Sequence, residues 1–183
     1  MQPITGGYNA LKALKKMSNN LFFEFSVNKK NNTIRVIREF NGDPALVWKA
    51  WTTAELLDQW WGPEPCRVET KTMDFRPGGY WHYAMIVPDV GTFWSRVNYV
   101  AIETETSFSA IDGFCDENGS MSPNFAQNLW NGTFTTKGNK VKVDLLYTFD
   151  TLADLEKTLA MNFEEGFTKD LHQLDELLLT LKN

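Results

Sequence analysis

The feature that most constrains the fold is a change of hydrophobic period at Asp150. Between Cys66 and Phe149, apolar and polar residues alternate in short runs separated by Gly, Pro and Asn, which is typical of antiparallel strands. After Asp150 the apolar residues recur every three or four positions, the spacing of one helix face. A sheet followed by a long amphipathic helix must pack the two together. The sequence therefore predicts an α+β fold, a curved antiparallel sheet wrapped around a long C-terminal helix.

The strand pattern predicts a meander of six strands after Cys66. Arg76-Pro77-Gly78-Gly79 suits a type II turn, and Lys137-Gly138-Asn139 joins the last two strands. A polar loop is expected from Asp116 to Asn128. The expected strands are Cys66–Phe75, Tyr80–Val87, Thr92–Ile102, Thr106–Phe114, Leu129–Thr136 and Lys140–Phe149.

Before the meander, the sequence predicts a hairpin and two short helices. The hairpin pairs Leu21–Val27 with Thr33–Phe40. Asp43-Pro44 then begins a helix, with Asp as the cap and Pro at the first helical position. Thr52-Thr53-Ala54-Glu55 resembles a capping box for a second helix, which Gly62-Pro63 ends.

The C-terminal helix is too long to be straight in a chain of 183 residues. Thr151 and Asp154 have the spacing of an N-terminal cap. Some thirty residues at about 1.5 Å each would extend roughly 45 Å, so a bend is expected near Asn162 or Gly166. Glycine costs a helix about 1 kcal/mol relative to alanine. Something should therefore approach Gly166 closely, and packing against the sheet is favoured over a place in a cavity.

Composition limits the partners. The net charge of −5 argues against a nucleic-acid surface, and no apolar run reaches the roughly 20 residues of a membrane span. Two distant cysteines give neither a metal cluster nor a disulfide framework, which favours a reducing cytoplasm and no metal or cofactor. Residues 1–20 are expected to be an N-terminal extension, disordered or a short helix, and residues 21–183 a single domain.

Motifs along most of the chain resemble one family. They are Arg38-Glu39-Phe40, Pro44, Val47-Trp48, Ala50-Trp51-Thr52, Trp60-Trp61-Gly62-Pro63, Asp74 to Gly79, Asp112 to Gly119 and Gly166-Phe167. Their combination, from about Leu21 to Leu181, resembles bacterial homologues of the carboxy-terminal domain of the activator of Hsp90 ATPase, in the START-like or Bet v 1-like (SRPBCC) superfamily. The resemblance implies a helix-grip fold with a cavity between sheet and C-terminal helix, a cavity that the superfamily uses for lipids, sterols, polyketides and other apolar molecules.

Aromatic residues are the candidates for lining such a cavity. Trp81, Tyr83 and Met85 share one face of their strand, although periodicity does not fix which face points inward. A role in filling the core is an equal alternative for them, and for Trp60 and Trp61 a structural role as packing wedges is favoured. The full candidate set is Trp60, Trp61, Trp81, Tyr83, Met85, Trp94, Phe108, Trp130, Phe163 and Phe167.

The sequence offers no catalytic constellation. His82 and His172 are expected outside the cavity, and Glu164, Glu165 and Asp170 are expected to form a solvated helix face. Asp74 to Gly79 lacks the pattern of a phosphate loop and is expected to be a hairpin turn, with Asp74 and Arg76 able to pair.

Three functions remain open. The favoured one is a non-enzymatic protein that binds a small apolar or aromatic molecule, for transport, sequestration or stress response. The first alternative is a cofactor-independent cyclase, lyase or hydrolase that uses Tyr83, His82 or a carboxylate. The second, suggested by the family name, is an Hsp90 co-chaperone role. A homodimer through exposed aromatics or a sheet edge is also open.

Overall fold

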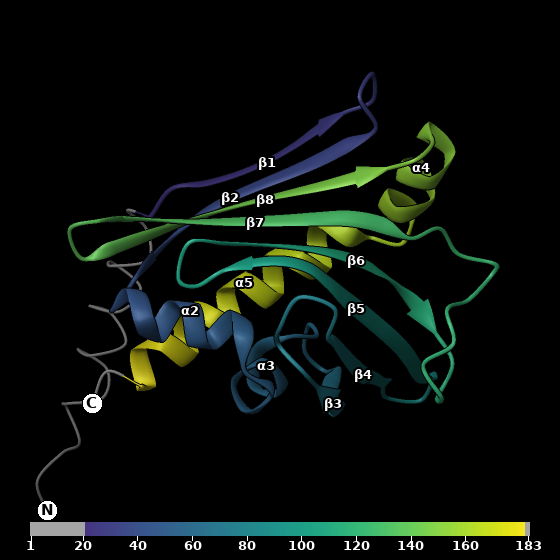
Figure 1. Cartoon of the computed structure of the whole chain (residues 1–183), viewed down its shortest axis with the longest axis horizontal. Coiled ribbons are helices and arrows are strands. Elements are labelled where there is room, and N and C mark those ends of the chain that lie inside the picture. Colours follow the sequence, from purple (N-terminus) through teal and green to yellow (C-terminus); the bar gives the residue numbers. More distant parts are fainter. Residues whose placement is uncertain (1–20, 182–183) are drawn as a thin grey trace, which may run out of the picture.

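The computed structural model describes residues 21–181, and the expected N-terminal extension at residues 1–20 lies outside them. Within these residues, one antiparallel sheet of eight strands curves around a long helix, and three shorter helices accompany it (Figure 1). The predicted α+β helix-grip architecture is therefore confirmed. No helix among the described residues is long and apolar enough to cross a membrane.

The strands follow the alternating pattern closely. Strand β4 and strand β8 begin and end at the residues predicted for them, and the others differ by one to three positions at most at either end. The strands are β1 Phe23–Asn28, β2 Thr33–Asn41, β3 Arg67–Met73, β4 Tyr80–Val87, β5 Gly91–Glu103, β6 Ser107–Cys115, β7 Asn128–Lys137 and β8 Lys140–Phe149.

The sheet order is β1-β2-β8-β7-β6-β5-β4-β3. The first hairpin therefore joins the end of the meander, with Ile34 opposite Tyr147 in the β2–β8 pair. Between β3 and β4, the Gly79 N–H donates to the Arg76 carbonyl over 2.8 Å, and Gly78 has a φ of +80°, as the predicted turn requires. Asp74 and Arg76 form an ion pair at this turn, over 2.8 Å.

The helices are α2 Pro44–Thr52, α3 Ala54–Trp60, α4 Leu152–Ala160 and α5 Phe163–Thr180. Asp43 caps α2 as predicted, because its Oδ1 accepts from the Leu46 N–H over 3.1 Å. The capping box predicted for α3 is wrong: the Thr53 hydroxyl instead donates back to the Lys49 carbonyl in α2, over 2.9 Å. That bond is available because one residue alone separates the two helices.

The predicted bend in the C-terminal helix occurs at Asn162. This residue has a left-handed conformation with a φ of 58°, which separates α4 from α5. The Thr151 hydroxyl caps α4 by accepting from the Asp154 N–H over 3.2 Å. Helix α5 lies across the sheet, while α4 sits at one end of it, beside the β6–β7 loop (Figure 1).

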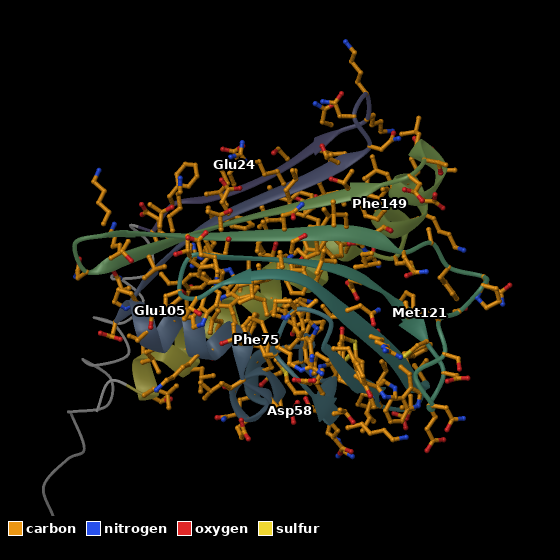
Figure 2. All side chains as sticks on the ribbon, viewed as in Figure 1. Glu24, Asp58, Phe75, Glu105, Met121 and Phe149 are labelled. Atoms are coloured by element: carbon orange, nitrogen blue, oxygen red, sulfur yellow. The ribbon has the colours of Figure 1, made fainter. Side chains whose placement is uncertain are left out.

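The space between the sheet and α5 is packed solidly at the end near α2 and α3. Trp51 and Trp60 meet edge to face there at a centroid distance of 4.7 Å, and the Trp60 Nε1–H donates to the Ala50 carbonyl. Phe75 packs on Trp48 at the same end, far from Met121 in the β6–β7 loop (Figure 2). We call this region the packed end.

Candidate functional site

A cavity of about 450 Å³ occupies the other end of the space between sheet and helix. We call this region the hollow end. It lies beneath α4 and the beginning of α5, next to the loop that connects β6 to β7. Its volume is within the range of pockets that hold a small organic molecule.

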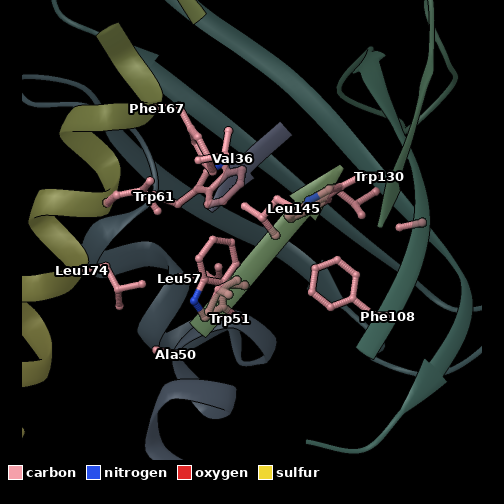
Figure 3. Close-up of a cluster of buried hydrophobic side chains, with 14 of the residues drawn as sticks. Val36, Ala50, Trp51, Leu57, Trp61, Phe108, Trp130, Leu145, Phe167 and Leu174 are labelled. Carbon is pink, nitrogen blue, oxygen red and sulfur yellow. The ribbon is translucent and has the colours of Figure 1, made fainter. Parts of the chain in front are cut away.

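Aromatic side chains of the helical layer form one wall of the cavity. Phe163 and Phe167 come from the first turns of α5 and stack at a centroid distance of 5.4 Å. Trp61, which follows α3, meets Phe167 edge to face at 5.8 Å (Figure 3). Trp61 also contacts Trp51 of the packed end, so this indole divides the packed end from the hollow end.

The sheet supplies the opposite wall. Tyr83 and Met85 of β4, Ser95 of β5, Asp112 of β6 and Asn128 of β7 all face the cavity. Tyr83 and Ser95 are direct partners in the β4–β5 register, which explains why they point to the same side. The sheet wall therefore combines polar and apolar side chains.

Exposed apolar side chains mark where the cavity reaches solvent. Phe93, Phe125 and Met161 line it and are between 38% and 47% exposed. Lys157 of α4 lies beside them, where its ammonium donates to the Asn124 carbonyl and sits 4.4 Å from the Phe125 ring centroid. The mouth thus opens between α4, the β4–β5 turn and the β6–β7 loop.

Tyr83 is the polar centre of the sheet wall. Its Oη accepts from the Trp61 Nε1–H over 3.1 Å, and its ring stacks on Trp81 at 4.0 Å. Burial raises the pKa of Tyr83 well above its usual value, and the charge of Asp112 raises it further. The phenol is therefore neutral at every physiological pH and acts as a hydrogen-bonding group.

Asp112 has an unusual protonation behaviour. Removal from water raises its pKa to about 6, although hydrogen bonds from the Gly113 backbone and the Asn128 side chain oppose the change. At neutral pH this carboxyl is mostly ionised but within reach of protonation. The Asn128 Oδ1 has no hydrogen-bond partner among the described residues.

Asp170 of α5 is buried more deeply, at 5% exposure. Burial raises its pKa to about 8, and a hydrogen bond from the Gly62 backbone N–H opposes that change. Its Oδ1 atom is buried without a partner among the described residues. Asp170 is therefore mostly protonated at neutral pH, in the wall that also carries Phe163 and Phe167.

The segment after α3 is fastened to α5. The Gln173 side-chain amide donates to the carbonyls of Trp60 and Gly62 over 2.8 and 2.9 Å, while its oxygen accepts from the Glu64 N–H. These bonds, together with the bond from Gly62 to Asp170, hold Trp61 against the cavity. The tryptophan pair is thus a structural anchor through Trp60 and a cavity wall through Trp61.

Gly166 lies at the cavity, and its neighbour differs from the expected one. A methyl group added to it would meet the Pro63 ring at 3.6 Å, an ordinary contact, and no strand lies within 4 Å. The prediction that Gly166 packs against the sheet is therefore wrong. The loop held by Gln173 occupies the space between this part of α5 and the strands.

The ten aromatic and methionine candidates divide into three groups. Trp61, Tyr83, Met85, Phe163 and Phe167 line the cavity. Trp60, Trp81, Phe108 and Trp130 are almost fully buried in the core and do not line it. Trp94 lies on the opposite face of the sheet, because it pairs with Ala84 and contacts His82 at a centroid distance of 4.9 Å.

Both histidines lie outside the cavity. His82 is buried on the outer face of the sheet, where a ring nitrogen is 3.2 Å from the Asp116 carbonyl oxygen and burial lowers its pKa. His172 is exposed on α5. The general acid or base predicted for His82 under the enzymatic alternative therefore has no access to a ligand in the cavity.

The sequence interpretation missed Asp112 and Asp170. Asp170 was expected on a solvated face with Glu164 and Glu165, and that prediction is wrong because Asp170 faces the cavity. A signal was present: Asp170 follows Phe167 by three positions and precedes Leu174 by four, which places it on the apolar stripe. Asp112 alternates with Ala110 and Phe108 in the same way.

The two carboxyl groups do not form a metal site. Among residues 21–181, no group of three or more His, Cys, Asp or Glu side chains is arranged to hold a metal ion. The cavity offers aromatic surfaces together with hydrogen-bond acceptors, which come from Asp112 and Asn128 of the sheet and from Asp170 of α5.

Solved structures of other proteins have the same fold as this chain. Protein Ms6760 from Mycobacterium smegmatis has a TM-score of 0.79 at 25% identity, over 86% of this chain and 96% of that one. A protein from Arthrobacter aurescens has a TM-score of 0.80 at 24% identity, over 86% and 91%. A protein from Staphylococcus epidermidis has a TM-score of 0.75 at 24% identity, over 85% of this chain and 94% of that one.

The comparison also covers sequence families. No functionally curated protein matches this chain. The model of the family described as Activator of Hsp90 ATPase homolog 1-like protein matches residues 41–179, which include both walls of the cavity. The chain therefore belongs to the Activator of Hsp90 ATPase homolog 1-like family and has its helix-grip fold.

Proposed function

We propose that the protein binds a small, largely apolar or aromatic molecule in the cavity of the hollow end. The observation that carries this proposal is the cavity itself, about 450 Å³ in volume and walled by aromatic side chains of both layers. Apolar cavities of this size normally cost stability, because close packing would bury the same side chains better. A ligand would supply the missing contacts.

The wall chemistry supports a ligand with an apolar body and a few polar atoms. Trp61, Phe163 and Phe167 offer flat surfaces for stacking, and Met85 adapts to irregular shapes. Tyr83 and Asn128 can fix the orientation of a polar substituent. The apolar rim at the mouth would favour entry of such a molecule.

The test is binding of apolar fluorescent probes and of a metabolite panel, measured by fluorescence, thermal shift and native mass spectrometry. Met85→Trp would fill part of the cavity and should weaken binding at least about tenfold. Val100→Trp is the matched control, since Val100 is 54% exposed and does not line the cavity. Equal binding by both variants, or no binding by the unmodified protein, would refute the proposal.

A second candidate function is proton-transfer catalysis without a cofactor. It is favoured by Asp112 and Asp170, whose pKa values of about 6 and about 8 lie on either side of neutrality within one cavity. One carboxylate would accept a proton while the other carboxyl donates one. Exchange of α-protons of an aryl ketone with D₂O, followed by NMR, would reveal such activity, and exchange unaffected by Asp112→Asn would exclude this residue as the base.

A further inference from the structure

The cavity has an excess of acidic and acceptor groups. Asp112, Asp170 and Asn128 all line it, and two of their oxygen atoms, Asp170 Oδ1 and Asn128 Oδ1, are buried without a partner among the described residues. A buried acceptor without a donor costs about 1–3 kcal/mol. These atoms therefore call for a ligand that donates hydrogen bonds.

Basic side chains do not compensate for this acidity. Of the described residues that line the cavity, Lys157 alone is basic, and it lies at the rim with its ammonium engaged by the Asn124 carbonyl. An anionic ligand, such as a fatty acid, would place its charge near Asp112 and Asp170 without a cation nearby. The electrostatics of the inner cavity thus favour a positive ligand group.

Aromatic rings surround the position that such a group would occupy. Phe167 precedes Asp170 by three residues on α5, so their side chains share one face of the helix. Trp61 and Phe163 each lie within 6 Å of the Phe167 ring, centroid to centroid. Ring faces attract a cation within about 6 Å, and the attraction is greatest where water is excluded.

From this arrangement we infer that the cavity selects a hydrophobic amine, with the ammonium group on Asp170 Oδ1 and the apolar body among Trp61, Phe163 and Phe167. This inference rests on the proposed binding function and names its ligand class. The ammonium would donate hydrogen bonds to Asp170 and toward Asn128. The amine would replace the proton that Asp170 carries in the empty cavity.

The replacement has a measurable consequence. The amine arrives protonated, and Asp170 gives up its proton when the ion pair forms, so binding at pH 7 should release close to one proton. The titratable groups that face Asp170 from the sheet are Tyr83 and Tyr147, whose pKa values are raised and which stay neutral; Asp112, with a pKa of about 6, releases little at this pH.

The experiment compares three probes that share a naphthyl group: the amine 2-(1-naphthyl)ethylamine, the alcohol 2-(1-naphthyl)ethanol and the carboxylate 1-naphthaleneacetate. Isothermal titration calorimetry in buffers of different ionisation enthalpy gives both affinity and proton release. The amine should bind at least about tenfold more tightly than the alcohol, and the acetate most weakly. Asp170→Asn should remove that preference and the proton release, while leaving alcohol binding intact.

Glu164→Gln is the matched control, because it likewise replaces a carboxyl with an amide, at an exposed position of the same helix. It should leave all three affinities unchanged. An alcohol or acetate that binds as tightly as the amine, or amine binding without proton release by the unmodified protein, would overturn the inference while leaving the binding function intact. If neither these probes nor the apolar panel bind, the binding function itself fails, and this inference with it.

Discussion

Two aspartates on α5 show how differently the packed end and the hollow end are built. Asp175, toward the packed end, forms a buried ion pair with Arg38 of β2. Asp170, five residues earlier at the hollow end, accepts a hydrogen bond from the Gly62 N–H, and its Oδ1 has no partner among the described residues. Burial raises the pKa of both. Among the described residues, the carboxylate at the packed end therefore has a counter-ion, whereas the carboxyl at the hollow end has none.

The largest effect is expected when the ion pair between Asp175 and Arg38 at the packed end is broken. Asp175→Asn should destabilise the protein by about 3–5 kcal/mol, because Arg38 would remain buried, at 7% exposure, without its counter-ion. Chemical denaturation at pH 7 measures the loss. The double variant with Arg38→Met removes both charges and should recover most of the stability. A single variant as stable as the unmodified protein would mean that the two ends do not differ in this respect.

The corresponding substitution at the hollow end should change the free energy of unfolding in the opposite direction. Asp170→Asn should stabilise the empty protein by roughly 1–3 kcal/mol at pH 8, where about half of the native carboxyl is ionised. Because its pKa rises from an ordinary value near 4 to about 8 on folding, the native state binds more protons in that window, and the free energy of unfolding falls as the pH rises from 4 to 8.

Denaturation of the unmodified protein and of Asp170→Asn at several pH values tests this prediction. In the variant, the free energy of unfolding should fall less steeply as the pH rises. Its decrease between pH 4 and 6 should persist, because Asp112 has a pKa of about 6. Identical pH profiles for the two proteins would show that Asp170 is not held in an unfavourable environment.

The smallest effect concerns Gly166 at the hollow end. Gly166→Ala should stabilise α5 by about 0.5–1 kcal/mol, since the added methyl meets Pro63 at an ordinary distance of 3.6 Å. Thermal denaturation measures the gain. The glycine at position 132 of the sheet is a useful contrast: an added methyl there would lie 2.8 Å from the Phe108 ring, so Gly132→Ala should destabilise. If Gly166→Ala destabilises the protein, a contact closer than that with Pro63 must exist at this position.

The sequence predicted the individual strands and helices better than their arrangement around the cavity. Alternation located strands β4 and β8 to the residue, and a capping rule located the start of α2, because these depend on neighbours in the chain. The length of the C-terminal helical pattern predicted a bend near Asn162 or Gly166, and the bend occurs at Asn162. The position of β2 beside β8 was not predictable, since alternation says which side chains share a face but not which strands are adjacent.

The candidate site was predicted in part for the same reason. Tyr83 and Met85 were grouped on one strand face, and the structure places both on the cavity wall. Trp94 was placed with them, but its neighbour Phe93 is equally aromatic, so the pattern did not determine which of the two points inward. Asp170 was judged by the charged residues next to it rather than by its place on the apolar stripe, and the empty space beside it depends on the whole sheet.

The Gln173 hydrogen bonds also determine how the site can deform. They join α5 to the segment from Trp60 to Glu64, so Trp61, Pro63 and Phe167 belong to one stiff unit. In helix α4, which precedes Asn162, Leu155 is fully buried, and exposed polar contacts join Lys157 to the Asn124 carbonyl and Glu156 to Lys29. We therefore expect a larger ligand to displace α4 at the mouth, while the geometry at Asp170 stays constant.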